Sequence, residues 1–336
     1  MKLHRLLAGV ALAIQSCSLS TAAEHLAAEA AKPPVYPRVT LAPQYEVVRG
    51  WPTRPPGVEG AAVSAIALDR DGNVWLYTRK NPTVQVYTPD GRYVRGWTEP
   101  NPKTVPHGLK FDRDGNVWLV DVGLHVARKF SPDGHVLQVL GTMGEPGEDA
   151  THFFQPTDIA FAPNGDIFVS DGYGNNRVAM FDKAGKFLKQ VGKGKGGPED
   201  KGNGPGEWVL PHKLAVDAQE NLYIIDREGH RLQVYDKNLN YLREIKIEGW
   251  NPWDIGISRK GDDGFAYIAD HALERMHKLS LKNGKIVATW GKQGLGPGEF
   301  DWVHGVVVDS KGAVYAADTY GQRIQKFVPS GTPTMR

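Results

Sequence analysis

An internal repeat constrains the fold of this chain more than any other feature of its sequence. Each unit contains a short apolar segment, a turn that is typically of the Asp-Gly-Asn kind, and a second apolar segment, which ends near Asp in five of the units. Six units occur, and their first segments cover residues 64–69, 107–112, 157–162, 212–217, 253–258 and 304–309. Short apolar runs joined by Gly- and Asn-containing turns are typical of paired β-strands, because these residues tolerate a positive φ.

The spacing of the units predicts how the strands are grouped. The second segments end at aspartates that lie 50, 55, 44 and 48 residues apart, namely Asp121, Asp171, Asp226, Asp270 and Asp318. Units of about 40–50 residues with four strands each are typical of the blades of a propeller. We therefore expect an all-β fold, a six-bladed β-propeller.

The two ends of the repeat region are expected to meet. The sixth unit lacks a fourth strand, because the chain ends soon after Phe327. Residues 45–51 have the pattern of that missing strand. Pairing of this segment with the last blade would close the ring and remove an open sheet edge. The prediction is a single propeller domain over residues 45–330, followed by a tail at 331–336.

The N-terminal segment resembles a targeting signal. Lys2 and Arg5 precede a short apolar run at residues 6–14, and small residues follow at 21–23. This is the layout of a secretory signal peptide and is too short to span a bilayer. We expect a signal peptide at 1–23, a linker at 24–44, no integral membrane span, and a secreted or periplasmic protein. The alternative is a lipoprotein anchored through Cys17, the only cysteine.

Charge argues against one class of partner. The chain has 40 Lys and Arg against 38 Asp and Glu. A nucleic-acid-binding protein would usually carry a basic surplus. We expect no nucleic-acid partner.

Three histidines occupy the same position in alternate units. They are His107, His212 and His304, and the intervening units have Ser64, Thr157 and Trp253 at this position. In a six-membered ring, alternate positions are 120° apart, and the entry to each innermost strand lies at the mouth of the central channel. Three neutral imidazoles would converge there and leave a coordination position open, which suits Zn²⁺. The alternative is a water-filled polar channel with unrelated histidines.

Local motifs resemble those of a known family. Segments 106–109, 211–214 and 303–306 are similar to the metal-binding loops of peptidyl-α-hydroxyglycine α-amidating lyases, and 171–177 and 318–323 resemble NHL repeats. That family is a six-bladed propeller that uses Zn²⁺ to cleave the C–N bond of a peptidyl-α-hydroxyglycine, giving a peptide amide and glyoxylate. The resemblance implies that His107, His212 and His304 bind zinc.

The resemblance also implies roles for three further residues. Tyr173 stands at the position of the family's catalytic tyrosine, and Arg227 and Arg79 stand at those of its active-site arginines. A tyrosine with its usual pKa of about 10 is a weak base near neutral pH unless nearby cations lower that pKa. The expectation is that zinc and the two arginines do so. An arginine fork also suits a substrate carboxylate.

The chain departs from the family at several positions. Gly305 replaces the Asp that is taken to bind a structural Ca²⁺, which puts that calcium site in doubt, and Trp302 replaces a Met of the pocket wall. Neither of the two disulfides of the animal members is present. Their positions hold Phe154 with Gly174, and Tyr223 with Val234.

The sequence therefore favours a secreted, monomeric, zinc-dependent carbon–nitrogen lyase acting on a small molecule or peptide with a carboxylate. One alternative is a non-catalytic NHL propeller that binds a protein or glycan on its rim. The other is a zinc-dependent hydrolase of esters or lactones.

Overall fold

The computed structural model describes residues 38–42, 44–58, 60–192, 202–258 and 264–331, all of which belong to one compact unit. The predicted signal peptide, Cys17 and residues 332–336 of the predicted tail lie outside the described residues. No helix in the described part of the chain has the length and the apolar character needed to cross a bilayer.

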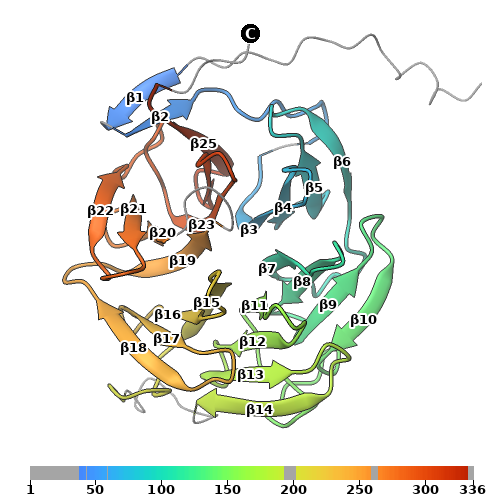
Figure 1. Cartoon of the computed structure of the whole chain (residues 1–336). Coiled ribbons are helices and arrows are strands. Elements are labelled where there is room, and N and C mark those ends of the chain that lie inside the picture. The colour runs from blue at the N-terminus through green and yellow to red at the C-terminus, as the bar shows by residue number, and fades with distance from the viewer. Residues whose placement is uncertain (1–37, 43, 59, 193–201, 259–263, 332–336) are drawn as a thin grey trace, which may run out of the picture. The chain divides into compact units, whose positions relative to one another are not determined.

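The described strands form six antiparallel sheets, which confirms the predicted six-bladed β-propeller (Figure 1). The first two sheets contain β3 (Val63–Leu68), β4 (Val74–Thr78), β5 (Val84–Tyr87) and β6 (Tyr93–Trp97), then β7 (Pro106–Phe111), β8 (Val117–Asp121), β9 (Val126–Phe130) and β10 (Val136–Leu140). The next two contain β11 (Asp158–Phe161), β12 (Ile167–Asp171), β13 (Arg177–Phe181) and β14 (Phe187–Gly192), then β15 (Pro211–Val216), β16 (Leu222–Asp226), β17 (Arg231–Tyr235) and β18 (Tyr241–Lys246). The fifth contains β19 (Pro252–Ile257), β20 (Phe265–Asp270), β21 (Arg275–Ser280) and β22 (Ile286–Trp290). The last contains β23 (Val303–Val308), β24 (Val314–Asp318), β25 (Arg323–Pro329), β2 (Tyr45–Val48) and β1 (Arg38–Ala42).

The last sheet joins the two ends of the repeat region, as predicted. Strand β2 pairs with β25 from Tyr45 opposite Pro329 to Val48 opposite Lys326. Strand β1 then pairs with β2, with Arg38 opposite Val48. Because β1 lies inside the predicted linker at 24–44, the sheet begins at Arg38 rather than at residue 45. This additional strand covers the edge of β2, which would otherwise present unpaired backbone groups.

The turns between strands follow from their residue types. The Asp69 carboxylate accepts hydrogen bonds from the backbone N of Asp71 at 3.0 Å and of Asn73 at 2.8 Å, and Gly72 has a φ of +82°. Asp side chains that bond the backbone two and four residues on favour such turns, and glycine adopts the positive φ without strain. Apolar residues then fill the space between neighbouring sheets, such as Trp75 and Tyr77 against Leu119 and Phe130.

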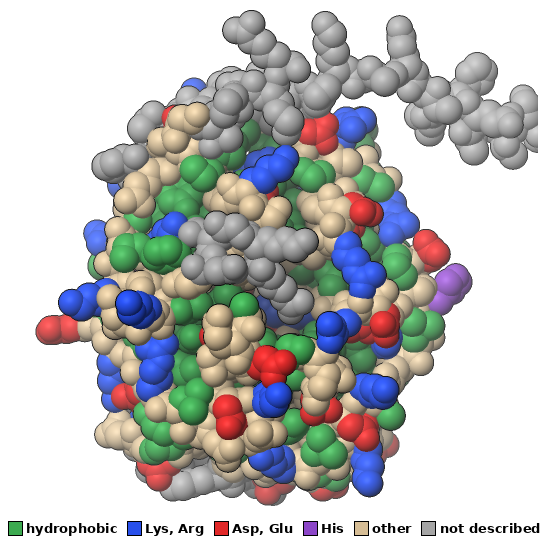
Figure 2. Space-filling view, in the orientation of Figure 1, with side chains coloured by type: hydrophobic (Ala, Val, Ile, Leu, Met, Phe, Trp, Pro, Cys, Tyr) green, Lys and Arg blue, Asp and Glu red, His purple; other side chains and the backbone are tan. Residues whose placement is uncertain are grey.

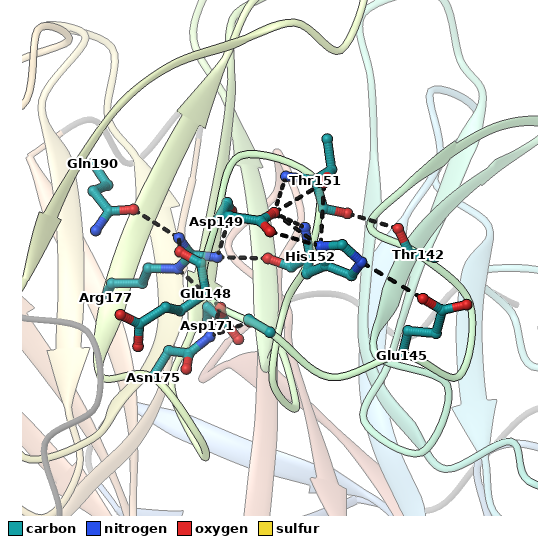
Figure 3. Close-up of polar contacts among 11 residues, drawn as sticks. Thr142, Glu145, Glu148, Asp149, Thr151, His152, Asp171, Asn175, Arg177 and Gln190 are labelled. Carbon is teal, nitrogen blue, oxygen red and sulfur yellow. Dashed lines mark hydrogen bonds and ion pairs between the residues drawn. The ribbon is translucent and has the colours of Figure 1, made fainter.

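Aspartates at the ends of three second strands bind arginines of the third strands. Arg177 has no exposed side-chain surface, and its Nε donates to Asp171 at 3.0 Å. Figure 3 shows that its other nitrogens bond Gln190 and the backbone carbonyls of the preceding loop, including those of Glu148 and His152. Arg231 and Arg323 bind Asp226 and Asp318 in the same way. These arginines are structural.

Charged side chains of both signs are interspersed on the face drawn in Figure 2. This mixture matches the nearly equal numbers of acidic and basic residues in the chain.

Irregular pairing at the start of the innermost strands positions the channel residues. The register between the first and second strands shifts between Pro106 and Gly108, and the same shift occurs at the equivalent place in β3, β15, β19 and β23. A bulge adds one residue to one strand and changes the direction of its side chain. In β7, β15 and β23 that extra residue is the histidine. Figure 1 shows these innermost strands around the centre of the ring.

Candidate functional site

The three histidines from alternate blades meet in the centre of the ring. His107, His212 and His304 each offer a ring nitrogen, and these three atoms lie within 4.8 Å of one another. The ring centroids are 4.9 to 5.3 Å apart, and all three side chains are buried. The separation allows one ion to lie between the three nitrogens. The arrangement is the one that the alternation of His with Ser64, Thr157 and Trp253 predicts.

Backbone carbonyls fix which ring nitrogen of each histidine faces the centre. Nδ1 of His107 lies 2.6 Å from the carbonyl oxygen of Thr157, and Nδ1 of His212 lies 2.7 Å from that of Trp253. Nδ1 of His304 lies 2.9 Å from the carbonyl oxygen of Ser64. A carbonyl only accepts hydrogen bonds, so each Nδ1 carries the proton and each Nε2 keeps its lone pair. Orientation of this kind is typical of metal-binding histidines.

Burial keeps the three imidazoles neutral. It lowers the pKa of His107, His212 and His304 well below the usual value of 6.5. Nearby positive charges, among them Lys213, lower it further. Neutral imidazole is the form that binds a metal. Three buried neutral nitrogens with fixed tautomers therefore fit a divalent transition metal.

Tyr173 lies beside this histidine cluster. It follows β12, and its hydroxyl oxygen is 3.0 Å from Nε2 of His107 and 3.4 Å from Nε2 of His212. Close packing holds the turn there, because a Cβ on Gly172 would lie only 2.0 Å from the carbonyl oxygen of Pro211, which directly precedes His212. Only glycine fits this approach.

The net effect of the protein's own groups is to raise the pKa of Tyr173. Burial raises it, and the opposing effects of Arg227 and Arg79 are smaller. The expected lowering by the two arginines is therefore present, but burial, which the sequence does not display, outweighs it. An additional cation next to the hydroxyl would be required to make it a base near neutral pH.

Arg227 contacts the site directly. It follows β16, and its Nη1 donates to the Tyr173 hydroxyl at 3.2 Å. Its guanidinium lies 4.3 Å from the centroid of the Trp253 ring, and its Nε donates to Glu228 at 2.8 Å. The side chain is thus held on one side by an aromatic face and on another by a carboxylate, with its charge at the histidine cluster.

Arg79 lies at the same mouth but acts at longer range. It follows β4, its side chain is exposed, and its backbone N donates to the carbonyl oxygen of Ala62 at 3.0 Å. Its positive charge contributes to the lowered pKa of His107 and His304. Of the three predicted catalytic residues, the structure therefore brings Tyr173 and Arg227 into contact with one another, with Arg79 nearby.

An aromatic wall, which we define as Trp253, His271, Trp302 and Tyr320, borders the histidines. Trp302 lies 5.2 Å from Trp253, 4.5 Å from His271 and 4.5 Å from Tyr320 between ring centroids. Trp253 in turn lies 5.4 Å from both His212 and His304. The indole nitrogen of Trp253 is buried and has no hydrogen-bond partner in the described structure, which is unusual for a polar atom.

Sequence reasoning identified the two tryptophans but missed His271 and Tyr320. A signal for both was present. Each follows the aspartate at the end of a second strand by one or two residues, as Arg227 and Tyr173 do. Comparing the two residues that follow the second strand in each of the six units would have found His271 and Tyr320.

Comparisons with known proteins support the resemblance and the fold. A model described as a 6-bladed beta-propeller matches residues 148–267, and the NHL repeat model matches 300–327. The mouse peptidyl-glycine alpha-amidating monooxygenase is 34% identical over 57% of this chain, which spans about a fifth (20%) of that protein. A probable peptidyl-alpha-hydroxyglycine alpha-amidating lyase of Caenorhabditis elegans is 39% identical over 31% of this chain and 29% of its own length. Human NHL repeat-containing protein 3 is 28% identical over 85% of this chain and 84% of its own length.

Solved structures share the architecture at low sequence identity. A streptogramin B lyase has a TM-score of 0.61 at 13% identity, covering 85% of this chain and 98% of that one. A virginiamycin B lyase from Staphylococcus aureus has a TM-score of 0.58 at 15% identity, covering 88% and 95%. These likenesses show the fold alone. The sequence matches, by contrast, confirm that the chain resembles the amidating lyases.

The positions that match the family's disulfides are neighbours in this structure. A Cβ on Gly174 would lie 2.3 Å from Cγ of Phe154, so the two positions are in direct contact. Tyr223 and Val234 lie opposite each other in the pairing of β16 with β17. The resemblance therefore extends from local motifs to contacts between distant residues, with apolar packing in place of sulfur.

Proposed function

We propose that this chain is a metal-dependent lyase that cleaves the C–N bond of a peptidyl-α-hydroxyglycine-type hemiaminal, with zinc as the metal. The products are an amide and glyoxylate, and the protein works outside the cytoplasm. The observation that carries the proposal is the convergence of three Nε2 lone pairs beside the Tyr173 hydroxyl, with the Arg227 guanidinium in contact with that hydroxyl. Lyase-named relatives at 33% and 39% identity support the reaction class.

The residues of the site divide the reaction between them. Arg227 would hold the substrate carboxylate through its guanidinium, since this fork matches two carboxylate oxygens. Tyr173 would accept the proton of the substrate hydroxyl at its oxygen and return it to the departing nitrogen. The C–N bond then breaks as the C–O bond becomes a carbonyl, so neither water nor an oxidant is consumed. The metal, when bound to the three histidines, would supply a Lewis acid that lowers the pKa of the substrate hydroxyl.

Burial explains why this site would favour such chemistry. The histidines lie in the channel, and the aromatic wall borders them on one side. Excluding water strengthens the interaction of the arginine with a carboxylate, because charges attract more strongly at low dielectric.

A second candidate is a non-catalytic NHL propeller. It is favoured by the similarity to NHL repeat-containing protein 3, which covers more of this chain than the matches to alpha-amidating enzymes do. The two candidates differ in two measurable properties, because the second requires neither a bound metal nor catalytic turnover.

The test is to measure metal content and products on the full chain. Elemental analysis of purified protein should find about one divalent metal per chain, and a synthetic peptidyl-α-hydroxyglycine should yield amide and glyoxylate in equal amounts. His212→Ala should lose both properties, while the exposed His135→Ala serves as a matched control and should keep them. A carboxylic acid in place of the amide would indicate a hydrolase. Absence of both metal and glyoxylate would favour the non-catalytic candidate.

A further inference from the structure

A second layer of residues lines the channel directly behind the histidine layer. It consists of the residue that follows each histidine or its counterpart on the six innermost strands. These residues are Ala65, Gly108, Asp158, Lys213, Asp254 and Gly305. The three charged members are adjacent, because β11, β15 and β19 belong to consecutive blades. A lysine is thus flanked on both sides by an aspartate.

Lys213 is buried and holds the histidine layer from behind. Its side chain is 2% exposed, and its Nζ donates to the backbone carbonyl oxygen of His107 at 2.8 Å. The same Nζ lies 4.0 Å from Oδ1 of Asp158, an oxygen that makes no hydrogen bond within the described structure. Lys110 approaches the other oxygen of Asp158 at 3.5 Å. The ammonium of Lys213 therefore links β15 to β7 across the channel and compensates a buried carboxylate.

The two aspartates tie further strands together. Oδ2 of Asp158 accepts from the backbone N of Leu214 at 3.0 Å, which links β11 to β15. Oδ2 of Asp254 accepts from the backbone N of Val306 at 2.9 Å, which links β19 to β23. Removal of the Lys213 ammonium would leave these two buried carboxylates with less compensating positive charge, which is strongly unfavourable.

These residues do not fit the structural calcium that the resemblance implies. Ca²⁺ takes six to eight oxygen ligands. Position 305 supplies no side-chain oxygen, although a Cβ there would lie 3.7 Å from Oδ2 of Asp254 and so would face this layer. The ammonium of Lys213 also lies close to Asp158 and would repel a second cation. Within the layer, Lys213 supplies one positive charge for two carboxylates, and Lys110, which lies outside the layer, supplies a second positive charge beside Asp158.

We propose that Lys213 acts as a built-in cation in this layer, in place of a bound divalent ion. It compensates Asp158 and Asp254, fixes the backbone of His107, and so limits the chain to one divalent metal, the one at the three histidines. The inference concerns the stability and the metal stoichiometry of the chain, and it holds whether or not the proposed reaction is correct.

The test compares wild type, Lys213→Met and Lys292→Met in the full chain, with and without Ca²⁺. Lys292 is an exposed lysine in an ion pair and serves as the matched control. Wild type and Lys292→Met should bind no Ca²⁺ in equilibrium dialysis and keep the same Tm when it is added. Lys213→Met should melt about 5–10 °C lower, because a buried charge loses its partner. Added Ca²⁺ should bind to this variant and restore much of the loss, since a ligand of the native state raises Tm.

Two results would overturn the proposal. One is Ca²⁺ binding by wild type with a higher Tm, and the other is a Lys213→Met variant as stable as wild type without Ca²⁺. If Lys213→Met does not fold, the double variant Lys213→Met/Asp254→Asn restores the charge balance with Lys110 and Asp158. If the double variant folds and Lys213→Met does not, the result supports the proposal. If neither variant folds even with Ca²⁺ present, packing rather than charge determines folding, and the proposal is overturned.

Discussion

The hydroxyl oxygen of Tyr173 lies 3.0 Å from Nε2 of His107, the ring nitrogen that faces the centre of the histidine cluster. The two residues are 66 positions apart in the chain and come from neighbouring blades. The contact joins a proton-carrying group to a candidate metal ligand. It makes Tyr173 the first residue to test.

Tyr173→Phe should lower kcat by about 10²–10³-fold, because the variant lacks the oxygen that accepts and returns the proton. The metal content should stay unchanged, since no ligand is altered. Glyoxylate release and elemental analysis on the same sample give both values. Tyr241→Phe, on the outer strand β18, is the control and should have normal activity. A Tyr173→Phe variant with full activity would exclude the tyrosine as the base.

Arg227→Met should raise KM at least about tenfold for substrates with a free carboxylate, because a bidentate charged contact is lost. The effect should largely disappear for a substrate in which that carboxylate is an amide. Steady-state kinetics with the matched substrate pair measure the difference. Arg227→Lys should be intermediate, since a lysine keeps the charge but not the fork. An equal rise in KM with both substrates would show that Arg227 does not bind the substrate carboxylate.

Arg177 and Arg323 offer a matched pair for measuring the effect of burial. Both bind the aspartate at the end of a second strand, but the side chain of Arg177 is 0% exposed and that of Arg323 is 24% exposed. Arg177→Met should lower the free energy of unfolding by about 3–5 kcal/mol, because Asp171 loses its buried partner. Arg323→Met should cost about 1–2 kcal/mol, since water reaches that pair. Denaturant unfolding measures both, and the reverse order would contradict this account.

Asp112 should contribute to acid sensitivity. Burial alone would raise the pKa of Asp112, but hydrogen bonds from Lys129, the backbone of Asn116 and Trp118 lower it overall. A carboxyl with a lowered pKa in the folded state stabilises the fold above the unfolded value of about 3.9, and this stability is lost as pH falls below it. The free energy of unfolding should therefore fall as the pH drops from about 4 through the lowered folded-state pKa of Asp112. Asp112→Asn should flatten this dependence, and the exposed Asp133→Asn should not.

The sequence predicted the parts of this structure that repetition encodes. The six units, the closing pairing of Tyr45 with the last blade and the convergence of alternate histidines all follow from comparing equivalent positions. Contacts that depend on the backbone could not be predicted in this way. The carbonyls of Ser64, Thr157 and Trp253 bond the histidines whatever their own side chains are.

Two further features were missed for different physical reasons. The pKa of Tyr173 depends on burial, which the sequence shows only indirectly. The charged layer around Lys213 was visible in principle, since its members follow the histidine position in each unit. Its meaning required the structure, in which the Lys213 ammonium reaches both the backbone carbonyl of His107 and the carboxylate of Asp158.

Closure of the last sheet by β2 and β25 affects how this chain must be made. A ribosome releases residues 45–48 long before it reaches 323–329, so the final blade has to wait for almost the whole polypeptide. Pairings between such distant residues form slowly, and a nascent chain exposes unpaired edges in the meantime. Proteolytic trimming of residues 38–48 would recreate that exposed edge on the finished protein and should promote its aggregation.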